Sequence, residues 1–222
     1  MAIVVLILEM VMSGPPVVED ARAPDVAEAP PVPSSVEGLA LAPVLVAEGL
    51  DSPTDVVGDP SSDRLFVVEK AGIVRIVDRG TILDTAFLDI TRWVESKGNE
   101  QGMLSMRFHP QYEENGRVFF FFTDRTGTSQ LVEGQVDFDM PDVVQPSSLR
   151  PVLTIPQYGQ YHQSGSMFFG PDGYLWLSLG DGGGIGDPEG HGQDTENIDA
   201  SIVRLDIDSA RPYAIPDTNP FV

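Results

Sequence analysis

The sequence predicts an all-β chain, and more specifically part of a β-propeller. Two observations support this prediction. Short β-rich segments alternate with turn-forming residues from about residue 44 onward, and one sequence unit recurs three times. Evenly spaced short strands are typical of sandwiches, barrels and propellers, and a recurring unit favours the propeller.

Five segments have the composition of strands. Each is rich in β-branched, aliphatic or aromatic residues and is bounded by Gly, Pro, Asp or Asn. These segments are 64–68, 73–77, 117–123, 174–179 and 202–207. No amphipathic helix of useful length is expected between them.

The recurring unit is a proline-containing turn that leads into a hydrophobic strand. It occurs at Pro60, Pro110 and Pro171, a spacing close to the roughly 40 to 50 residues of a propeller blade. Residues 44–222 therefore hold about three blades, whereas a propeller needs at least four to close. The sequence predicts a truncated propeller that exposes strand edges and self-associates.

Three regions are expected along the chain. Residues 1–14 contain an apolar run that is too short to span a bilayer and resembles a signal peptide, so we expect an extracytoplasmic protein without an integral membrane span. Residues 15–43 are rich in Pro, Ala and acidic residues, which indicates an extended tether. Residues 44–222 form the propeller part.

Charge and composition exclude several functions. The chain has 13 Lys and Arg against 34 Asp and Glu, a net charge of −21, which disfavours nucleic acid as a partner. The acidic surplus is compatible with cation binding, with halophilic solubility or with an acidic secreted protein. There is no cysteine, so thiolate metal sites and cysteine nucleophiles are excluded.

The three histidines are the candidates for proton transfer near neutral pH. His162 lies in a polar loop before an apolar segment, where it could act as a general base or merely cap backbone groups. His109 adjoins Pro110 at a turn and is expected to be structural. His191 lies among glycines and is expected to be exposed.

Two further segments carry polar groups. Residues 180–188 combine glycines with Asp181 and Asp187, a composition that suits a hard cation such as calcium but also an ordinary long turn. A dinucleotide site is excluded because no helix follows the glycines. Glu100 could hydrogen-bond a polyol, orient a histidine or lie in a solvated loop.

Taken together, these motifs resemble the glucose/sorbosone dehydrogenase family of six-bladed propellers. The resemblance covers most of residues 50–222 and is specific as a set, although each motif is weak alone. It rests on 49–50, 53–54, 100–104, 108–110, 162–165, 169–175, 180–183, Gln193, 204–206, 213–216 and 219–221.

The resemblance implies a sugar dehydrogenase that uses pyrroloquinoline quinone and calcium. His162 would be the general base that takes the proton from the anomeric hydroxyl of an aldose. The remaining site residues follow from the resemblance: Glu100, Gln101, Gln163 and Asp181 in the sugar and cofactor pocket, Gly183 and Gly184 at the quinone, and Asp187 and Pro188 at calcium. The quinone is needed because no side chain can accept a hydride.

The sequence also departs from the family pattern. An arginine and an asparagine that contact the quinone in family members are replaced here by the stretch 183–185. Asp199-Ala200-Ser201 replaces a Leu-Gly-Lys motif, which removes a positive charge and places a carboxylate in an expected core position. Further cationic quinone ligands of the family would lie beyond Val222.

Three functions therefore remain open. The first is a quinone-dependent oxidoreductase acting on an aldose. The second is a non-catalytic propeller that serves as a binding module, which the departures from the quinone site favour. The third is a calcium-dependent hydrolase of lactones.

Overall fold

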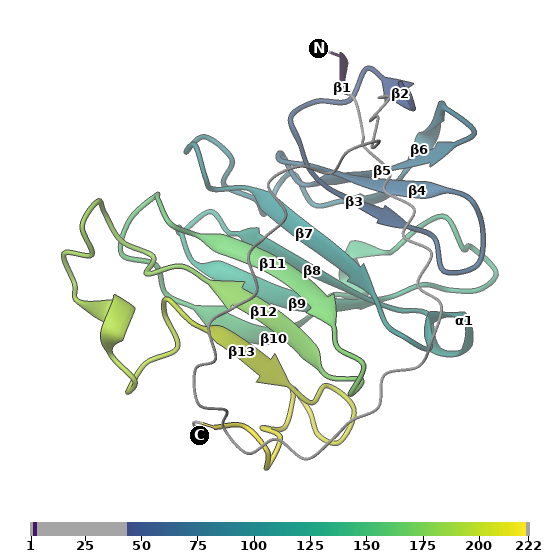
Figure 1. Cartoon of the computed structure of the whole chain (residues 1–222). Helices are drawn as coiled ribbons and strands as arrows, with labels where there is room; N and C mark the ends of the chain where they lie inside the picture. Colours follow the sequence, from purple (N-terminus) through teal and green to yellow (C-terminus); the bar gives the residue numbers. More distant parts are fainter. Residues whose placement is uncertain (1, 4–43, 221–222) are drawn as a thin grey trace, which may run out of the picture.

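A computed structural model describes residues 2–3 and 44–220 (Figure 1). The predicted tether, 15–43, and nearly all of the predicted signal segment, 1–14, lie outside the described residues. In the described part of the chain, no helix is long and apolar enough to cross a membrane.

Three antiparallel sheets, which we call the first, second and third blade, form the body of the protein (Figure 1). The first blade contains β3 (Pro53–Gly58), β4 (Leu65–Glu69), β5 (Ile73–Asp78) and β6 (Thr81–Asp89). The second contains β7 (Met103–Phe108), β8 (Arg117–Thr123), β9 (Ser129–Gln135) and β10 (Arg150–Ile155). The third contains β11 (Ser164–Phe169), β12 (Leu175–Leu179) and β13 (Ile202–Leu205). The predicted all-β fold with about three blades is confirmed.

Short elements complete the described structure. Strand β1 (Ala2–Ile3) pairs with β2 (Ala47–Glu48). One helical turn, α1 (Tyr112–Asn115), and two 3₁₀ turns, η1 (Pro146–Ser148) and η2 (His191–Gln193), lie in loops. The absence of any longer helix from the described residues agrees with the sequence-based expectation.

The predicted strands agree closely with the observed ones. The segment 117–123 coincides with β8, whereas the expected strand 202–207 ends two residues early, at Leu205. The reason is a local change of partner. Asp206 leaves the edge of β12 and forms a two-bond bridge with Ala214, with N–H to O distances of 3.0 and 2.7 Å.

The strands β3, β7 and β11 run side by side, one from each blade, and begin at the same end of the protein (Figure 1). Equivalent hydroxyl groups join them. Thr54 Oγ1 on β3 donates to the carbonyl oxygen of Met103 on β7 at 2.7 Å, and Ser105 Oγ on β7 donates to that of Gly165 on β11. The loops that precede these strands are thereby brought to one shared edge.

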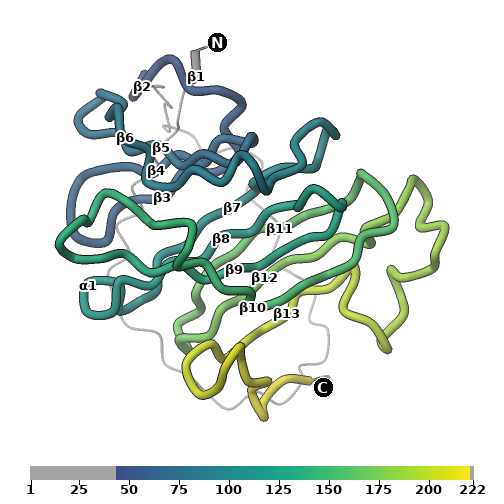
Figure 2. The backbone as a smooth tube through the Cα atoms, turned by 180° about the vertical axis from the view of Figure 1, so that it is seen from behind, coloured from purple at the N-terminus to yellow at the C-terminus, as the bar shows by residue number. Residues whose placement is uncertain are grey.

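Strand β8 lies at the centre of the described core. All seven of its residues are buried, and because strand side chains alternate between faces, its aromatic residues serve two interfaces. Phe120 and Phe122 belong to the apolar cluster shared with the first blade, and Phe119 and Phe121 belong to the cluster shared with the third. Figure 2 shows β8 from behind, between β7 and β9 of the second blade.

An ion network built around the buried pair Arg117 and Glu133 joins the second and third blades. Arg117 donates to both carboxylate oxygens of Glu133, at 2.8 and 3.1 Å, and also binds Asp208. Arg150 and Arg211 contact the same glutamate. Burial raises the pKa of Glu133, but hydrogen bonds from Arg117 and Arg150 outweigh this effect and lower the pKa overall. The network holds the segment after β13 against the second blade.

His109 has a structural position, in agreement with the prediction from sequence. Its side chain is buried, and its Nδ1 atom accepts hydrogen bonds from the Gln111 N–H at 3.0 Å and from Asn115 Nδ2 at 2.8 Å. Its Nε2 atom faces Asp208 at 3.3 Å. Burial lowers the pKa of His109, so the ring is held in its neutral form.

Gly165 lies at a close approach of β11 to the side chain of Phe121 on β8. A Cβ atom there would lie 2.3 Å from Phe121 Cδ1, and the residue has a φ of +104°. We expect Gly165→Ala to destabilise the fold by about 1–2 kcal/mol through its positive φ and by about a further 1–3 kcal/mol through overpacking. Guanidinium unfolding measures this loss.

Gly173→Ala is the matched control for this substitution. Gly173 also has a positive φ, +81°, but a Cβ there would meet nothing within 4 Å. The control should therefore show only the backbone contribution. Equal losses for the two variants would contradict the proposed clash with Phe121.

Candidate functional site

Three sequence-predicted residues meet at the edge where β7 and β11 begin. Glu100 lies in the loop before β7, His162 lies just before β11, and Asp181 follows β12. Strands β11 and β12 are antiparallel and pair Ser164 with Leu179. His162, two residues before this pair, and Asp181, two residues after it, therefore lie side by side. The site is therefore built by strand register and not by nearness in sequence.

His162 and Asp181 form a hydrogen-bonded pair. His162 Nδ1 lies 2.8 Å from Asp181 Oδ1, which also accepts the N–H of Gly183 at 3.1 Å. The Gly183 N–H is the main cause that lowers the pKa of Asp181; burial opposes it, and the hydrogen bond from His162 adds a smaller lowering effect. The carboxylate is therefore ionised at neutral pH, and the Nδ1 atom that faces it carries the proton.

The backbone of His162 is held in an uncommon conformation. Its φ is +58°, and its N–H donates to Glu100 Oε2, a contact that joins residues 62 apart in the sequence. Its carbonyl oxygen accepts the Gly182 N–H at 3.3 Å. Strained backbone of this kind persists only where surrounding groups fix it, and such residues are often found at functional sites.

Gly180 makes the pairing of His162 and Asp181 sterically feasible. A Cβ atom at position 180 would lie 1.9 Å from the carbonyl oxygen of His162. No side chain fits in that space without displacing the His162 loop. The glycine preceding Asp181 is thus required by close backbone approach.

The His162 ring can exchange protons with a bound molecule. Its side chain is 37% exposed, while that of Asp181 is 15% exposed. With Nδ1 engaged by the carboxylate, Nε2 is left as a proton acceptor, and among the described residues it has no hydrogen-bond partner. A histidine oriented by a carboxylate is the arrangement used for general base catalysis.

The two predicted glutamines have different surroundings. Gln163 is fully buried, and its Nε2 atom donates to the carbonyl oxygens of Gly159 and Tyr161 at 2.9 and 3.4 Å. Gln163 therefore stabilises the loop that carries His162 through two hydrogen bonds to its backbone. Gln101 is partly exposed, and its side chain lies against Gly98, where an added Cβ would be 2.5 Å from Oε1.

The glycine-rich segment forms a loop that extends away from the sheets between β12 and β13 (Figure 2). Gly183 is buried beside Asp181, whereas Gly184 is partly exposed. Ile185 is 93% exposed. The loop thus presents an apolar side chain to solvent close to the His162 site.

Asp187 fits the role of a backbone cap better than that of a calcium ligand. Its two carboxylate oxygens accept the N–H groups of His191 and Gly192 at 2.9 and 2.8 Å, and so start the η2 turn. Pro188 can offer only its carbonyl oxygen. In the described part of the chain, no group of three or more His, Asp or Glu side chains could hold a metal ion. The described side chains therefore do not fit a calcium site by themselves.

Among the described residues, no lysine or arginine side chain is hydrogen-bonded or ion-paired to His162 or Asp181. Lys70 lies beside the loop that carries Glu100, and its Nζ atom donates to the carbonyl oxygens of Gly98 and Asn99 at 2.6 and 3.1 Å. Pyrroloquinoline quinone is a tricarboxylate, and anions of that kind are bound by several cationic or N–H donors. The described part of the site does not fit the quinone by itself.

His191 is wrongly expected from its sequence context to be exposed. Its side chain is 15% exposed, and its Nδ1 atom lies 3.5 Å from Asp199 Oδ2 and 3.4 Å from the carbonyl oxygen of Asp181. Asp199, which the sequence places at a core position, is buried as expected. This second histidine–carboxylate contact was not predicted from the sequence. The acidic residue at core position 199 could have indicated it, because a buried carboxylate needs a partner.

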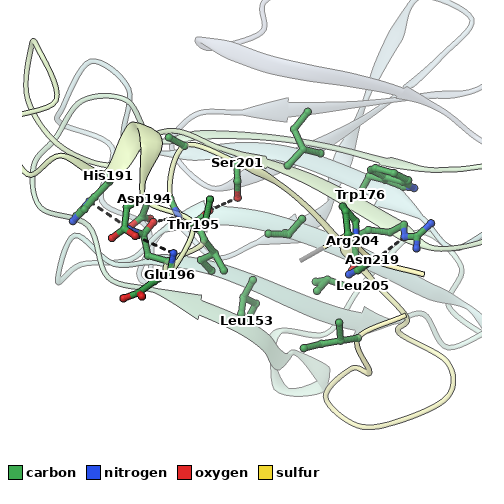
Figure 3. A pocket seen from close by; sticks show the side chains of 18 of the residues that line it. Leu153, Trp176, His191, Asp194, Thr195, Glu196, Ser201, Arg204, Leu205 and Asn219 are labelled. Carbon is green, nitrogen blue, oxygen red and sulfur yellow. Dashed lines mark hydrogen bonds and ion pairs between the residues drawn. The ribbon is translucent and has the colours of Figure 1, made fainter. Parts of the chain in front are cut away.

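A cleft of about 750 Å³ lies along the outer side of β13 (Figure 3). His191, Arg204 and Asn219 contribute to its walls, together with apolar side chains such as Leu153. His162 and Asp181 do not line this cleft. The cleft and the His162 edge are therefore separate features, with His191 and Asp199 between them.

The fold and the site define a class of protein: a propeller in which a carboxylate-oriented histidine stands at one end of the inner strands. The model of the glucose/sorbosone dehydrogenase family matches residues 50–222. The chain belongs to this family, which confirms the resemblance drawn from its motifs.

Three curated proteins are similar to the chain in sequence. The hedgehog-interacting proteins of Mus musculus and Homo sapiens are each 34% identical over 193 residues, covering 79% of this chain and 27% of theirs. The HIPL1 protein of Arabidopsis thaliana is 28% identical over 219 residues, covering 72% of this chain and 31% of its own. The chain spans about a third or less of the length of these relatives.

Solved structures confirm the fold. The pyrroloquinoline-quinone-bound form of aldose sugar dehydrogenase from Streptomyces coelicolor matches with a TM-score of 0.66 at 24% identity, over 79% of this chain and 49% of that one. The apo-form of the soluble aldose sugar dehydrogenase from Escherichia coli matches with a TM-score of 0.55 at 22% identity, over 78% and 48%. The three blades correspond to about half of a six-bladed propeller.

The Asp181 carboxylate should contribute to stability in a pH-dependent way. Because its pKa is lower in the folded chain than in the unfolded chain, the contribution is complete above the unfolded value of about 3.9 and is lost as the pH falls through the folded value. We expect the stability difference between the wild type and Asp181→Asn to shrink between pH 6 and pH 2.

Urea unfolding at a series of pH values measures this difference. Glu113→Gln, on the exposed side of α1, controls for the loss of one negative charge. A gap between wild type and Asp181→Asn that stays constant across the acid range would contradict the assignment of a stabilising ionised Asp181.

Proposed function

We propose that this protein is an exported oxidoreductase that oxidises an aldose, with His162 as the general base. The observation that carries the proposal is the 2.8 Å contact between His162 Nδ1 and Asp181 Oδ1, which leaves Nε2 free at a partly exposed edge. Membership of the glucose/sorbosone dehydrogenase family supports a sugar as the substrate class.

The residues of this chain can perform the proton part of such a reaction. Oxidation of a cyclic aldose to a lactone removes the proton of the anomeric hydroxyl and a hydride from the same carbon. His162 Nε2 would take the proton, and the ionised Asp181 would stabilise the imidazolium that results. The Glu100 carboxylate would hold the His162 backbone in place by accepting the His162 N–H.

The electron acceptor in this proposal is a quinone. It is supported by the structural likeness to an aldose sugar dehydrogenase solved with pyrroloquinoline quinone, whereas the shortage of cations around His162 opposes it. Calcium would accompany the quinone. The family resemblance suggests Asp187 and Pro188 for it, but the Asp187 carboxylate already accepts the N–H groups of His191 and Gly192, so other groups would have to complete that site. Export is supported by the apolar segment at 1–14.

A second candidate function is that of a binding module without catalysis. It is favoured by the low positive charge at the His162 edge and by Ile185, an almost fully exposed apolar residue on the adjacent loop. Two relatives at 34% identity are named hedgehog-interacting proteins. In this case the glycine-rich loop would contact a protein partner.

Sugar-dependent dye reduction tests the two functions. With pyrroloquinoline quinone, calcium and a series of aldoses, the full natural chain should reduce the dye, and His162→Ala should lower the rate by about 100-fold or more, since general base catalysis contributes 10² to 10⁴. Gln160→Ala, an exposed neighbour in the same loop, should behave like the wild type.

Two outcomes would count against the oxidoreductase. Absence of quinone binding to the wild-type chain, measured by calorimetry, would favour the binding module. Equal dye reduction by wild type and His162→Ala would remove His162 from the chemistry. Loss of rate in His162→Ala with unchanged quinone affinity would support the base.

A further inference from the structure

Asp199 is a buried carboxylate that the proposed proton transfer does not use. Its side chain is 8% exposed, and its Oδ1 atom is buried without a hydrogen-bond partner among the described residues. Burial raises the pKa of Asp199, and the nearby His191 opposes this only in part. A carboxylate in such surroundings is unfavourable unless it has a partner, so its neighbours indicate what it does.

His191 is the group that connects Asp199 to the candidate site. Its Nδ1 atom lies 3.5 Å from Asp199 Oδ2 and 3.4 Å from the carbonyl oxygen of Asp181. Both neighbours are acceptors, so Nδ1 carries a proton, which it donates to the Asp181 carbonyl oxygen while the Asp199 carboxylate lies beside it as the charged partner. In the described part of the chain, this is the one hydrogen bond that the Asp181 carbonyl receives.

The rest of the turn that carries Asp181 is held in the same way. The carbonyl oxygen of Gly180 accepts the Ala200 N–H at 2.8 Å, and that of Gly182 accepts the Tyr158 N–H at 2.8 Å. The Tyr158 ring packs on His191 with a centroid distance of 4.5 Å. Each carbonyl from 180 to 182 thus has a donor, and the donor to the middle one is a side chain oriented by Asp199.

We propose that Asp199 and His191 are positioning residues for Asp181 and, through it, for His162. The inference rests on the proposed role of His162 as a base. Asp199 orients the His191 ring, His191 fixes the peptide group of Asp181, and the fixed peptide directs the Asp181 carboxylate to His162 Nδ1. The result is a single tautomer of His162, with the proton on Nδ1 and the lone pair on Nε2.

An apolar residue at position 199 would fill the core without any cost of burying a charge. It could not, however, orient the His191 ring. This contrast makes Asp199→Leu an informative variant, because the substitution removes a poorly partnered buried charge and so is not expected to unfold the chain. Effects on His162 can then be separated from loss of stability.

The tautomer of His162 can be measured directly by ¹⁵N NMR of its ring nitrogens at pH 8, with the signals assigned by their absence in His162→Gln. The wild type should show the Nδ1–H tautomer alone. Asp199→Leu should show a mixture of both tautomers and at least about tenfold faster hydrogen exchange of the Gly183 N–H. Asp199→Asn, whose amide oxygen can still accept from His191, should lie between the two.

Glu189→Gln is the matched control, because it removes one negative charge from an exposed position of the same loop, and it should match the wild type. A wild-type tautomer and wild-type Gly183 exchange in Asp199→Leu would overturn the proposal. So would equally accelerated exchange of Gly183 and of the core residue Phe121, which would show general destabilisation. Because the measurement needs no sugar or electron acceptor, its result is independent of whether aldose oxidation is found.

Discussion

The packing of β8 between two blades is the constraint on which the rest of the structure depends. The side chains of β8 point alternately to the two faces of its sheet. One run of four phenylalanines therefore supplies the apolar interface with the first blade and the one with the third. Phe120 and Phe122 pack toward the first blade, while Phe119 and Phe121 pack toward the third. A shift of register by one residue would exchange the two sets and leave neither interface complementary.

The candidate site follows from the same interface. Phe121 lies so close to β11 that Gly165 has room for no side chain, and at that point Ser105 donates to the Gly165 carbonyl. The distance between β7 and β11 is therefore fixed by a tight aromatic contact and a hydrogen bond. Only with that spacing does the carboxylate before β7 reach the N–H before β11, which holds the strained backbone of His162.

The sequence is more informative about strands than about the contacts of the site. The run of aromatic residues at 117–123 predicts β8 with its observed ends, because composition and flanking turns are local signals. The contact between Glu100 and His162 joins residues 62 positions apart and depends on how two blades pack, which no local pattern encodes. The partial burial of His191 was missed for a different reason: its glycine neighbours suggested exposure, whereas its partner Asp199 lies further along the same loop.

The electrostatics of the His162 edge narrow the kind of molecule that it can receive. Asp181 and Glu100 place two carboxylates within hydrogen-bond reach of one histidine, in a chain with a net charge of −21. An anionic ligand would be repelled there, whereas a neutral polyol can donate hydroxyl groups to these acceptors and meet the free Nε2 atom. The described half of the propeller thus favours a neutral, hydroxyl-bearing ligand at His162 over an anionic one.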